Sequence, residues 1–277
     1  MSQESRPEIG TSVVAAGITT NYLEGGERAA PPVLLLHGSG PGVTAYANWR
    51  LTIPELSTRL RVVAPDLVGF GFTERPVGVR YDMDTWVGQV VGLLDALGLE
   101  RASVVGNSFG GALALRLAAR HPDRVERLVL MGSVGVPFTI TDGLDRVWGY
   151  QPSVESMLDL IGLFAHSREL VTDELAEVRY RASIEPGFQE SFAAMFPAPR
   201  QRWVDAMVPP DAEIAALPHR PLVVHGREDR VIPLDNALHL LRTVPDVRLH
   251  VFGRCGHWTQ IEHAAAFNGL VLDFLTS

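Results

Sequence analysis

The chain has little cysteine, no long apolar run and no excess of positive charge. Cys255 is the single cysteine among 277 residues, so an internal disulfide is excluded, and this suits a reducing compartment. The first ten residues are polar and lack the apolar segment of a secretion signal. No run approaches the 18 apolar residues of a membrane span. We therefore expect a cytoplasmic protein with no membrane partner.

The formal net charge of −8 at pH 7 makes nucleic acid a poor partner. It does not exclude an anionic small molecule, because a few local arginines can outweigh the global sign. With 277 residues, 46% of them hydrophobic, the chain can bury a large core. These values fit a single enzyme domain that carries an insertion.

Apolar runs alternate with amphipathic stretches along most of the chain, which is typical of a mostly parallel sheet flanked by helices. The alternation stops between residues 137 and 209, where three stretches indicate helices instead (154–166, 169–183 and 188–196). We interpret this segment as a helical lid inserted after the sixth strand, with residues 1–136 and 210–277 forming an α/β core domain. The strands are predicted at residues 33–36, 61–65, 102–106, 127–131, 221–225 and 247–252.

Ser108 lies between Gly106 and Gly110, directly after one apolar run and directly before a helical run. This pattern is typical of a nucleophile elbow, in which a serine occupies a tight turn that leaves no room for side chains two positions away. The N–H of Phe109 and the positive end of the following helix would then face a developing oxyanion.

A serine hydroxyl needs a base to take its proton and a carboxylate to orient that base. Asp229 follows the predicted strand 221–225, and His257 follows the next strand. The chain order Ser, Asp, His is that of the α/β-hydrolases. The closest rivals are His225, which precedes a glycine and is expected to pack beneath the site, and Glu228, whose side chain should turn to the opposite face from Asp229.

The run 33–36 leads into the loop His-Gly-Ser-Gly-Pro-Gly at residues 37–42. Small residues let backbone N–H groups approach a substrate closely. In this fold the second oxyanion donor comes from the loop after this strand, so we expect it to be the N–H of Ser39. Gly40 is expected to contact the substrate, and His37 to brace the loop.

Three motifs together resemble those of the meta-cleavage product hydrolases, which hydrolyse carbon–carbon bonds in bacterial aromatic degradation. They are the loop 37–42, the elbow 106–111 and Gly-His-Trp-Thr-Gln at residues 256–260. The resemblance runs from about Asn21 to the C-terminus. Ser39 and Phe109 make the chain most similar to the monocyclic branch, the hydrolases of 2-hydroxymuconic semialdehyde and 6-alkyl-2-hydroxy-6-oxohexa-2,4-dienoates, because the biphenyl branch usually has glycine and methionine there.

The resemblance implies an anionic dienol carboxylate as the substrate and no metal or cofactor. Arg179 corresponds to the family's carboxylate-binding arginine, whereas Arg181 would point elsewhere on the helix. Asn48 and Asn107 correspond to asparagines near the substrate's 2-oxygen and carboxylate, and Trp258 to an aromatic wall beside the catalytic histidine. We also expect a homo-oligomer, either a dimer or a tetramer.

The implied reaction ketonises the dienol, attacks or hydrates the C6 ketone and cleaves C5–C6 to give 2-hydroxypenta-2,4-dienoate and a small carboxylic acid. Whether Ser108 forms an acyl-enzyme or activates water is left open. The alternatives are a carboxylesterase or lactonase on the same fold and, more remotely, a non-catalytic ligand receptor. The apolar end of the pocket is expected to be formed by Val134, Leu144, Trp148, Val231 and Ile232.

Overall fold

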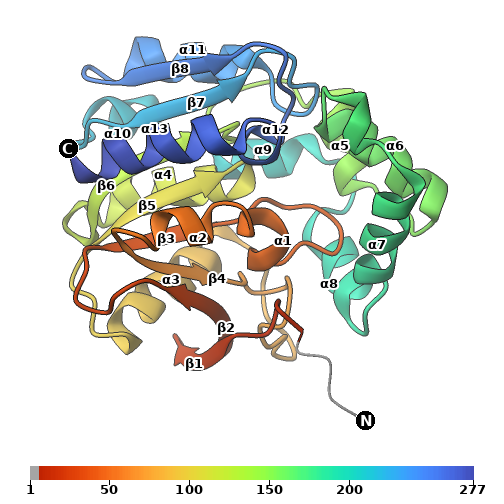
Figure 1. Ribbon diagram of the computed structural model, residues 1–277, viewed down its shortest axis with the longest axis horizontal. Coiled ribbons are helices and arrows are strands. Elements are labelled where there is room, and N and C mark those ends of the chain that lie inside the picture. Colours follow the sequence, from red (N-terminus) through yellow and green to blue (C-terminus); the bar gives the residue numbers. More distant parts are fainter. Residues whose placement is uncertain (1–5) are drawn as a thin grey trace.

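The computed structural model describes residues 6–277 and contains one eight-stranded sheet in the order β1-β2-β4-β3-β5-β6-β7-β8 (Figure 1). Strands β3 to β8 are parallel to their neighbours among themselves. Each of the six predicted runs is a strand in this sheet, and the predicted α/β fold is confirmed. The six are β3 (Pro32–Leu36), β4 (Arg61–Pro65), β5 (Ala102–Asn107), β6 (Val125–Met131), β7 (Leu222–Gly226) and β8 (Arg248–Phe252).

Two further strands at the N-terminal edge were not predicted. Strands β1 (Thr11–Ala15) and β2 (Ile18–Gly25) form an antiparallel hairpin, and β2 also pairs antiparallel with β4. The two turn residues, Ala16 and Gly17, have φ values of 49° and 81°, as expected of a two-residue hairpin turn. Neither strand has the continuous apolar sequence of a buried parallel strand, which explains why a search for apolar runs missed them.

Helices cover both faces of the sheet because alternate strand residues point to opposite sides. On one face Leu34 and Leu36 share a core with α3 (Met83–Ala96), α4 (Phe109–Arg120) and α11 (Leu234–Thr243). On the other face, Val33 and Leu35 pack with residues of three other helices. These are α1 (Ala45–Trp49), α2 (Ile53–Leu56) and α13 (Ala264–Thr276). The shorter elements are η1 (Pro122–Arg124), α10 (Asp211–Ala215) and α12 (Thr259–Glu262). In the described part of the chain, no helix has the length and apolar character that crossing a membrane requires.

A run of helices separates β6 from β7, and α5 to α8 form a layer beside the sheet, in green and teal in Figure 1. The three predicted helices are present with shorter bounds, while α5 and α9 were not predicted. The predicted stretch 169–183 becomes a 3-10 turn, η2 (Arg168–Leu170), followed by α7, because the Thr172 hydroxyl accepts a hydrogen bond from the Leu175 N–H and begins the helix there. The run comprises α5 (Asp142–Trp148), α6 (Val154–Phe164), η2, α7 (Asp173–Ser183), α8 (Phe188–Met195) and α9 (Gln201–Met207).

A fully buried carboxylate, Asp66, follows β4 and forms hydrogen bonds to three different segments of the chain. It accepts hydrogen bonds from the N–H groups of Ala45 (2.6 Å) and Phe72 (2.8 Å) and from the Asn21 side-chain amide (2.8 Å). Ala45 is the first residue of α1, so this contact fixes the end of the loop that contains Ser39. Burial raises the pKa of Asp66 to about 6, although these donors and Arg75 favour its charged form.

The raised pKa predicts an unusual dependence of stability on pH. Between pH 4 and 6 the folded protein holds a proton on Asp66 that the unfolded chain releases, so this group's stabilising contribution is lost as the pH rises through about 6. Relative to Asp66→Asn, the wild type should lose up to about 3 kcal/mol of unfolding free energy across that window. Urea denaturation of both proteins at pH 4, 5, 6 and 7 measures it. A constant difference between them would contradict the prediction.

Candidate active site

Ser108 occupies a strained turn between β5 and α4, with φ 54° and ψ −114°. The turn is possible because the chain has no side chains on either flank. A Cβ on Gly106 would lie 2.3 Å from the carbonyl oxygen of Gly110, and one on Gly110 would lie 2.3 Å from the carbonyl oxygen of Leu36. A non-glycine residue with positive φ is costly and points to a functional constraint. The geometry is that of a nucleophile elbow.

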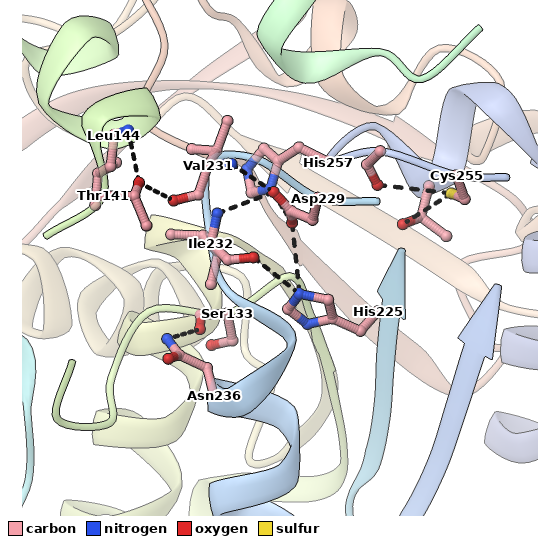
Figure 2. Close-up of polar contacts among 12 residues, drawn as sticks. Ser133, Thr141, Leu144, His225, Asp229, Val231, Ile232, Asn236, Cys255 and His257 are labelled. Atoms are coloured by element: carbon pink, nitrogen blue, oxygen red, sulfur yellow. Dashed lines mark hydrogen bonds and ion pairs between the residues drawn. The ribbon is translucent and has the colours of Figure 1, made fainter. Parts of the chain in front are cut away.

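His257 and Asp229 form a buried pair with 2.7 Å between Nδ1 and Oδ2 (Figure 2). The other carboxylate oxygen of Asp229 accepts hydrogen bonds from the N–H groups of Val231 (2.8 Å) and Ile232 (2.9 Å). Burial by itself would raise the pKa of Asp229, but the facing His257 and the hydrogen bonds lower it, so the carboxylate is charged. It therefore holds Nδ1 protonated and leaves Nε2 free to accept a proton.

Gly132, which follows β6, leaves the space that this pair occupies. A Cβ at that position would lie 3.2 Å from Nδ1 of His257 and 3.4 Å from Oδ2 of Asp229. The glycine has φ 50°, which a side chain would disfavour as well. The loop after β6 thus contacts the pair from a third direction.

Neither rival residue takes the place of its counterpart in this pair, although Nε2 of His225 also lies 3.6 Å from Oδ2 of Asp229 (Figure 2). The ring of His225 is buried, its Nε2 lies 3.0 Å from the carbonyl oxygen of Ile232, and burial lowers its pKa, so it is a neutral donor beneath the acid (Figure 2). The carboxylate of Glu228 accepts from the Cys255 N–H (2.9 Å) and pairs with Arg227. The structure thus pairs Asp229, and not Glu228, with His257.

The loop after β3 is held by side chains beneath it. Nε2 of His37 accepts from the Leu67 N–H (3.0 Å), which places the ring proton on Nδ1, 2.8 Å from the Gly38 carbonyl oxygen. Burial lowers the pKa of His37 to about 4, so the ring is neutral and braces the loop. Within residues 6–277 no hydrogen bond occupies the N–H of Ser39 or of Phe109. Both remain available to an oxyanion.

Most of the predicted site residues line one narrow cavity, with a volume of about 40 Å³, between the sheet and the helices that follow β6. The predicted residues that line it are Ser39, Gly40, Asn48, Asn107, Ser108, Leu144, Arg179, Val231, His257 and Trp258.

Arg179 supplies a positive charge to this wall. Its Nη2 donates to the Pro41 carbonyl oxygen (3.2 Å), and none of the carboxylates in the described residues forms an ion pair with it. Burial and the nearby Arg50 lower its pKa to about 10, so it is still a cation at neutral pH. Arg181, by contrast, is exposed and paired with Glu177 at 2.8 Å. The arginine in the cavity is therefore the one without an anionic partner.

Asn48 adds an unsatisfied donor to the same cavity. Its Oδ1 accepts from the Gly38 N–H (3.2 Å), while its buried Nδ2 has no partner in residues 6–277. Buried polar groups are usually hydrogen-bonded, so an amide left open on a cavity wall is suited to bind an oxygen atom of a ligand.

Three residues predicted for the apolar end are buried but are not among those lining this cavity. Trp148 donates from Nε1 to the Ser39 hydroxyl (2.9 Å) and stacks on Phe196. Ile232 contacts the acid through its backbone, and the Val134 N–H donates to the Ser108 carbonyl oxygen (3.2 Å).

Sequence reasoning missed Val43, Val147 and Phe164, which do line the cavity. Val147 lies in the unpredicted helix α5, and no local motif marks the other two. Among residues 6–277 no group of three or more potential ligands is placed to hold a metal ion.

Comparisons with known proteins agree with this fold. The family model described as alpha/beta hydrolase fold matches residues 31–264. The chain is 61% identical to the 2-hydroxymuconate semialdehyde hydrolase of Pseudomonas sp. strain CF600, over 98% of this chain and 95% of that protein. It is 59% identical to the 2-hydroxy-6-oxo-2,4-heptadienoate hydrolase of Pseudomonas putida F1, over 98% and 97%.

A solved structure gives the same result. The meta-cleavage product hydrolase CumD from Pseudomonas fluorescens IP01, a serine-to-alanine mutant complexed with acetates, has 57% identity and a TM-score of 0.95, covering 97% of this chain and 98% of that one. Sequence and architecture agree over nearly the whole length. The chain therefore belongs to the α/β-hydrolase fold family and, within it, to the meta-cleavage product hydrolases.

Proposed function

We propose that this protein hydrolyses the C5–C6 bond of 2-hydroxymuconic semialdehyde or of 6-alkyl-2-hydroxy-6-oxohexa-2,4-dienoates. One observation carries the proposal: an elbow serine, a histidine paired with a buried aspartate and an arginine without an anionic partner all belong to one narrow cavity. The first two can activate a nucleophile, and the third can bind a carboxylate. The names of the two most identical relatives that we compared support this substrate class.

In the proposed mechanism, Arg179 pairs with the substrate carboxylate, and the Asn48 amide donates to the 2-oxygen. Asn107, on the same wall, contacts the carboxylate end. Binding the anion at this end places the C6 carbonyl near Ser108. A bidentate contact from arginine would fix the orientation as well as the charge of the substrate.

Ser108 and His257 perform the acid–base and nucleophilic steps. The dienol is first converted to its keto form. The C2 carbonyl can then accept, through the C3–C4 double bond, the electron pair that C5 receives when the C5–C6 bond breaks. His257 then takes a proton from Ser108 or from a water that it activates, and the oxygen attacks C6. The N–H groups of Ser39 and Phe109 bind the resulting oxyanion. When the C5–C6 bond breaks, its electron pair passes into a dienolate, which takes up a proton to give 2-hydroxypenta-2,4-dienoate. On the serine route the acyl group stays on Ser108 until a water activated by His257 hydrolyses the ester, and on the water route the acid forms directly. Both routes release a small carboxylic acid and restore the Ser108 hydroxyl.

The helices that follow β6 act as a lid in this proposal, because α6 and α7 supply Phe164 and Arg179 to the cavity wall. Division of the chain into a core (1–136 and 210–277) and a lid (137–209) is part of the proposal. So are a cytoplasmic location and a dimeric or tetrameric homo-oligomer. An ordinary carboxylesterase would use the same triad, but it has no need of an unpaired arginine on the cavity wall.

The first functional prediction concerns the nucleophile and base. Ser108→Ala and His257→Ala should each abolish cleavage of the yellow ring-fission products while leaving the fold intact, because members of a cooperating unit do not act separately. Loss of the substrate's visible absorbance measures turnover, and circular dichroism checks the fold. Turnover like that of the wild type in either variant would refute the triad.

A second prediction separates Arg179 from its exposed neighbour. Arg179→Ala should raise KM and lower kcat for the dienol carboxylate by about tenfold or more, and it should change p-nitrophenyl acetate hydrolysis little, since that ester has no carboxylate. Arg181→Ala is the matched control and should behave as the wild type with both substrates. An equal loss with both substrates in Arg179→Ala would assign Arg179 a structural role.

A third prediction concerns the C6 substituent. Leu144, Val147 and Val231 narrow the cavity with branched side chains, so substrates with hydrogen, methyl or ethyl at C6 should exceed the 6-phenyl substrate by at least about tenfold in kcat/KM. Steady-state kinetics of the four compounds under one set of conditions tests this. Equal values for 6-phenyl and 6-methyl would place the chain outside the monocyclic branch.

A further inference from the structure

Glu262, at the end of α12, joins two segments that lie far apart in the sequence. Its Oε2 accepts hydrogen bonds from the N–H groups of His166 and Ser167, both at 2.7 Å, and its Oε1 accepts from the Gly256 N–H at 2.7 Å. The first two donors follow α6 in the helical run after β6. The third immediately precedes His257. One carboxylate therefore bridges that run and the loop that contains the proposed base.

Backbone contacts reinforce the same junction. The carbonyl oxygen of Phe164 accepts hydrogen bonds from the N–H groups of His257 (2.7 Å) and Trp258 (3.2 Å). The Phe164 ring stacks on Trp258, with centroids 5.0 Å apart and an interplanar angle of 15°, and lies 5.9 Å from the His257 ring.

The backbones of the two segments are in close contact at this junction. A Cβ on Gly256 would lie 2.5 Å from the Phe164 carbonyl oxygen and 2.9 Å from the His166 nitrogen. A displacement of residues 164–167 would therefore press directly on the loop at residues 255–258. A group that holds both segments would therefore also help to hold the orientation of His257.

We propose that Glu262 is a positioning residue that locks the end of α6 to the His257 loop, so that the two segments form one rigid unit. The inference rests on the proposed role of His257 as the base, and it adds the means by which the helices after β6 control that base. Phe164 completes the unit, because it lines the cavity and packs against the base.

Only a glutamate fits the geometry of this contact. The three N–H donors require two acceptor oxygens at the end of a side chain long enough to reach both segments. Glutamine would present an NH2 group to one set of these N–H donors, which are exposed or half-buried, and that donor-to-donor contact would lose the hydrogen bond. Aspartate keeps the charge but shortens the reach by one methylene. The two substitutions therefore separate charge from geometry.

The test compares Glu262→Gln and Glu262→Asp with the wild type. Each should lower kcat about tenfold, both for the dienol carboxylate and for p-nitrophenyl acetate, since a misplaced base affects both reactions. KM for the dienoate should change less than about twofold, because the carboxylate contacts are untouched. This pattern differs from that of Arg179→Ala, which spares the ester. Glu169→Gln removes the same charge from an exposed site just after α6 and should leave all values unchanged.

Hydrogen exchange tests the lock independently of the reaction. In Glu262→Gln the amides of residues 164–167 and 255–258 should exchange faster together, at least about tenfold, while β5 and α4 stay protected. If hydrogen exchange becomes faster in only one of the two segments, or in neither, the proposed link through Glu262 is wrong, whatever the substrate of the enzyme is. If both loosen and kcat is unchanged for both substrates, Glu262 does not position His257. Failure of the wild type to cleave any dienoate would reject the proposed function alone, since exchange and ester hydrolysis would still test the lock.

Discussion

The close approach of α4 to the ends of β3 and β5 is the constraint on which the rest of the site depends. Gly106 and Gly110 have no side chains, so the helix begins against the backbone of Leu36 and His37. This contact forces Ser108 into a strained conformation and places the loop containing Ser39 next to it. The N-terminal N–H groups of α4 then face the position where negative charge would develop. The strain at one residue is offset by packing over the whole sheet.

The electrostatic character of the cavity depends on which of its charged and polar side chains have partners in the protein. Asp229 accepts hydrogen bonds from His257 and from two backbone N–H groups, and His225 lies 3.6 Å away, so its charge is well compensated. Within residues 6–277, Arg179 is a cation whose hydrogen-bond partner is a carbonyl oxygen, and the Asn48 amide has a donor without a partner. Although the protein has an overall charge of −8, its cavity contains a positive charge and a hydrogen-bond donor that an anion could pair with. The oxygen atoms of the proposed dienol carboxylate would bind these groups, and its apolar end would contact Leu144 and Val231.

Much of this architecture could be predicted because its signals are local. Buried parallel strands are continuous apolar runs, and the elbow is a glycine pattern over five residues. The hairpin β1–β2 lacks such a run and was missed. Phe164 and Glu262 were missed for another reason. Phe164 contacts His257 and Trp258, and Glu262 contacts His166 and Ser167. These partners lie about 95 residues away, and no spacing rule reports such a contact.

Trp148 illustrates how a residue with the right chemistry can serve a different contact. Its size and its place at the start of the predicted lid suggested a wall for the apolar end of the pocket. Its indole instead donates to the Ser39 hydroxyl and stacks on Phe196 at 4.3 Å. Phe196 in turn packs edge-on against Phe109 at 6.1 Å. Aromatic contacts from the helices after β6 thus reach both residues whose N–H groups are proposed to bind the oxyanion. Together with the Glu262 contact to the His257 loop, these contacts connect the helices to both proposed oxyanion donors and to the proposed base. The same segment that lines the cavity therefore also contacts the groups that are proposed to react in it.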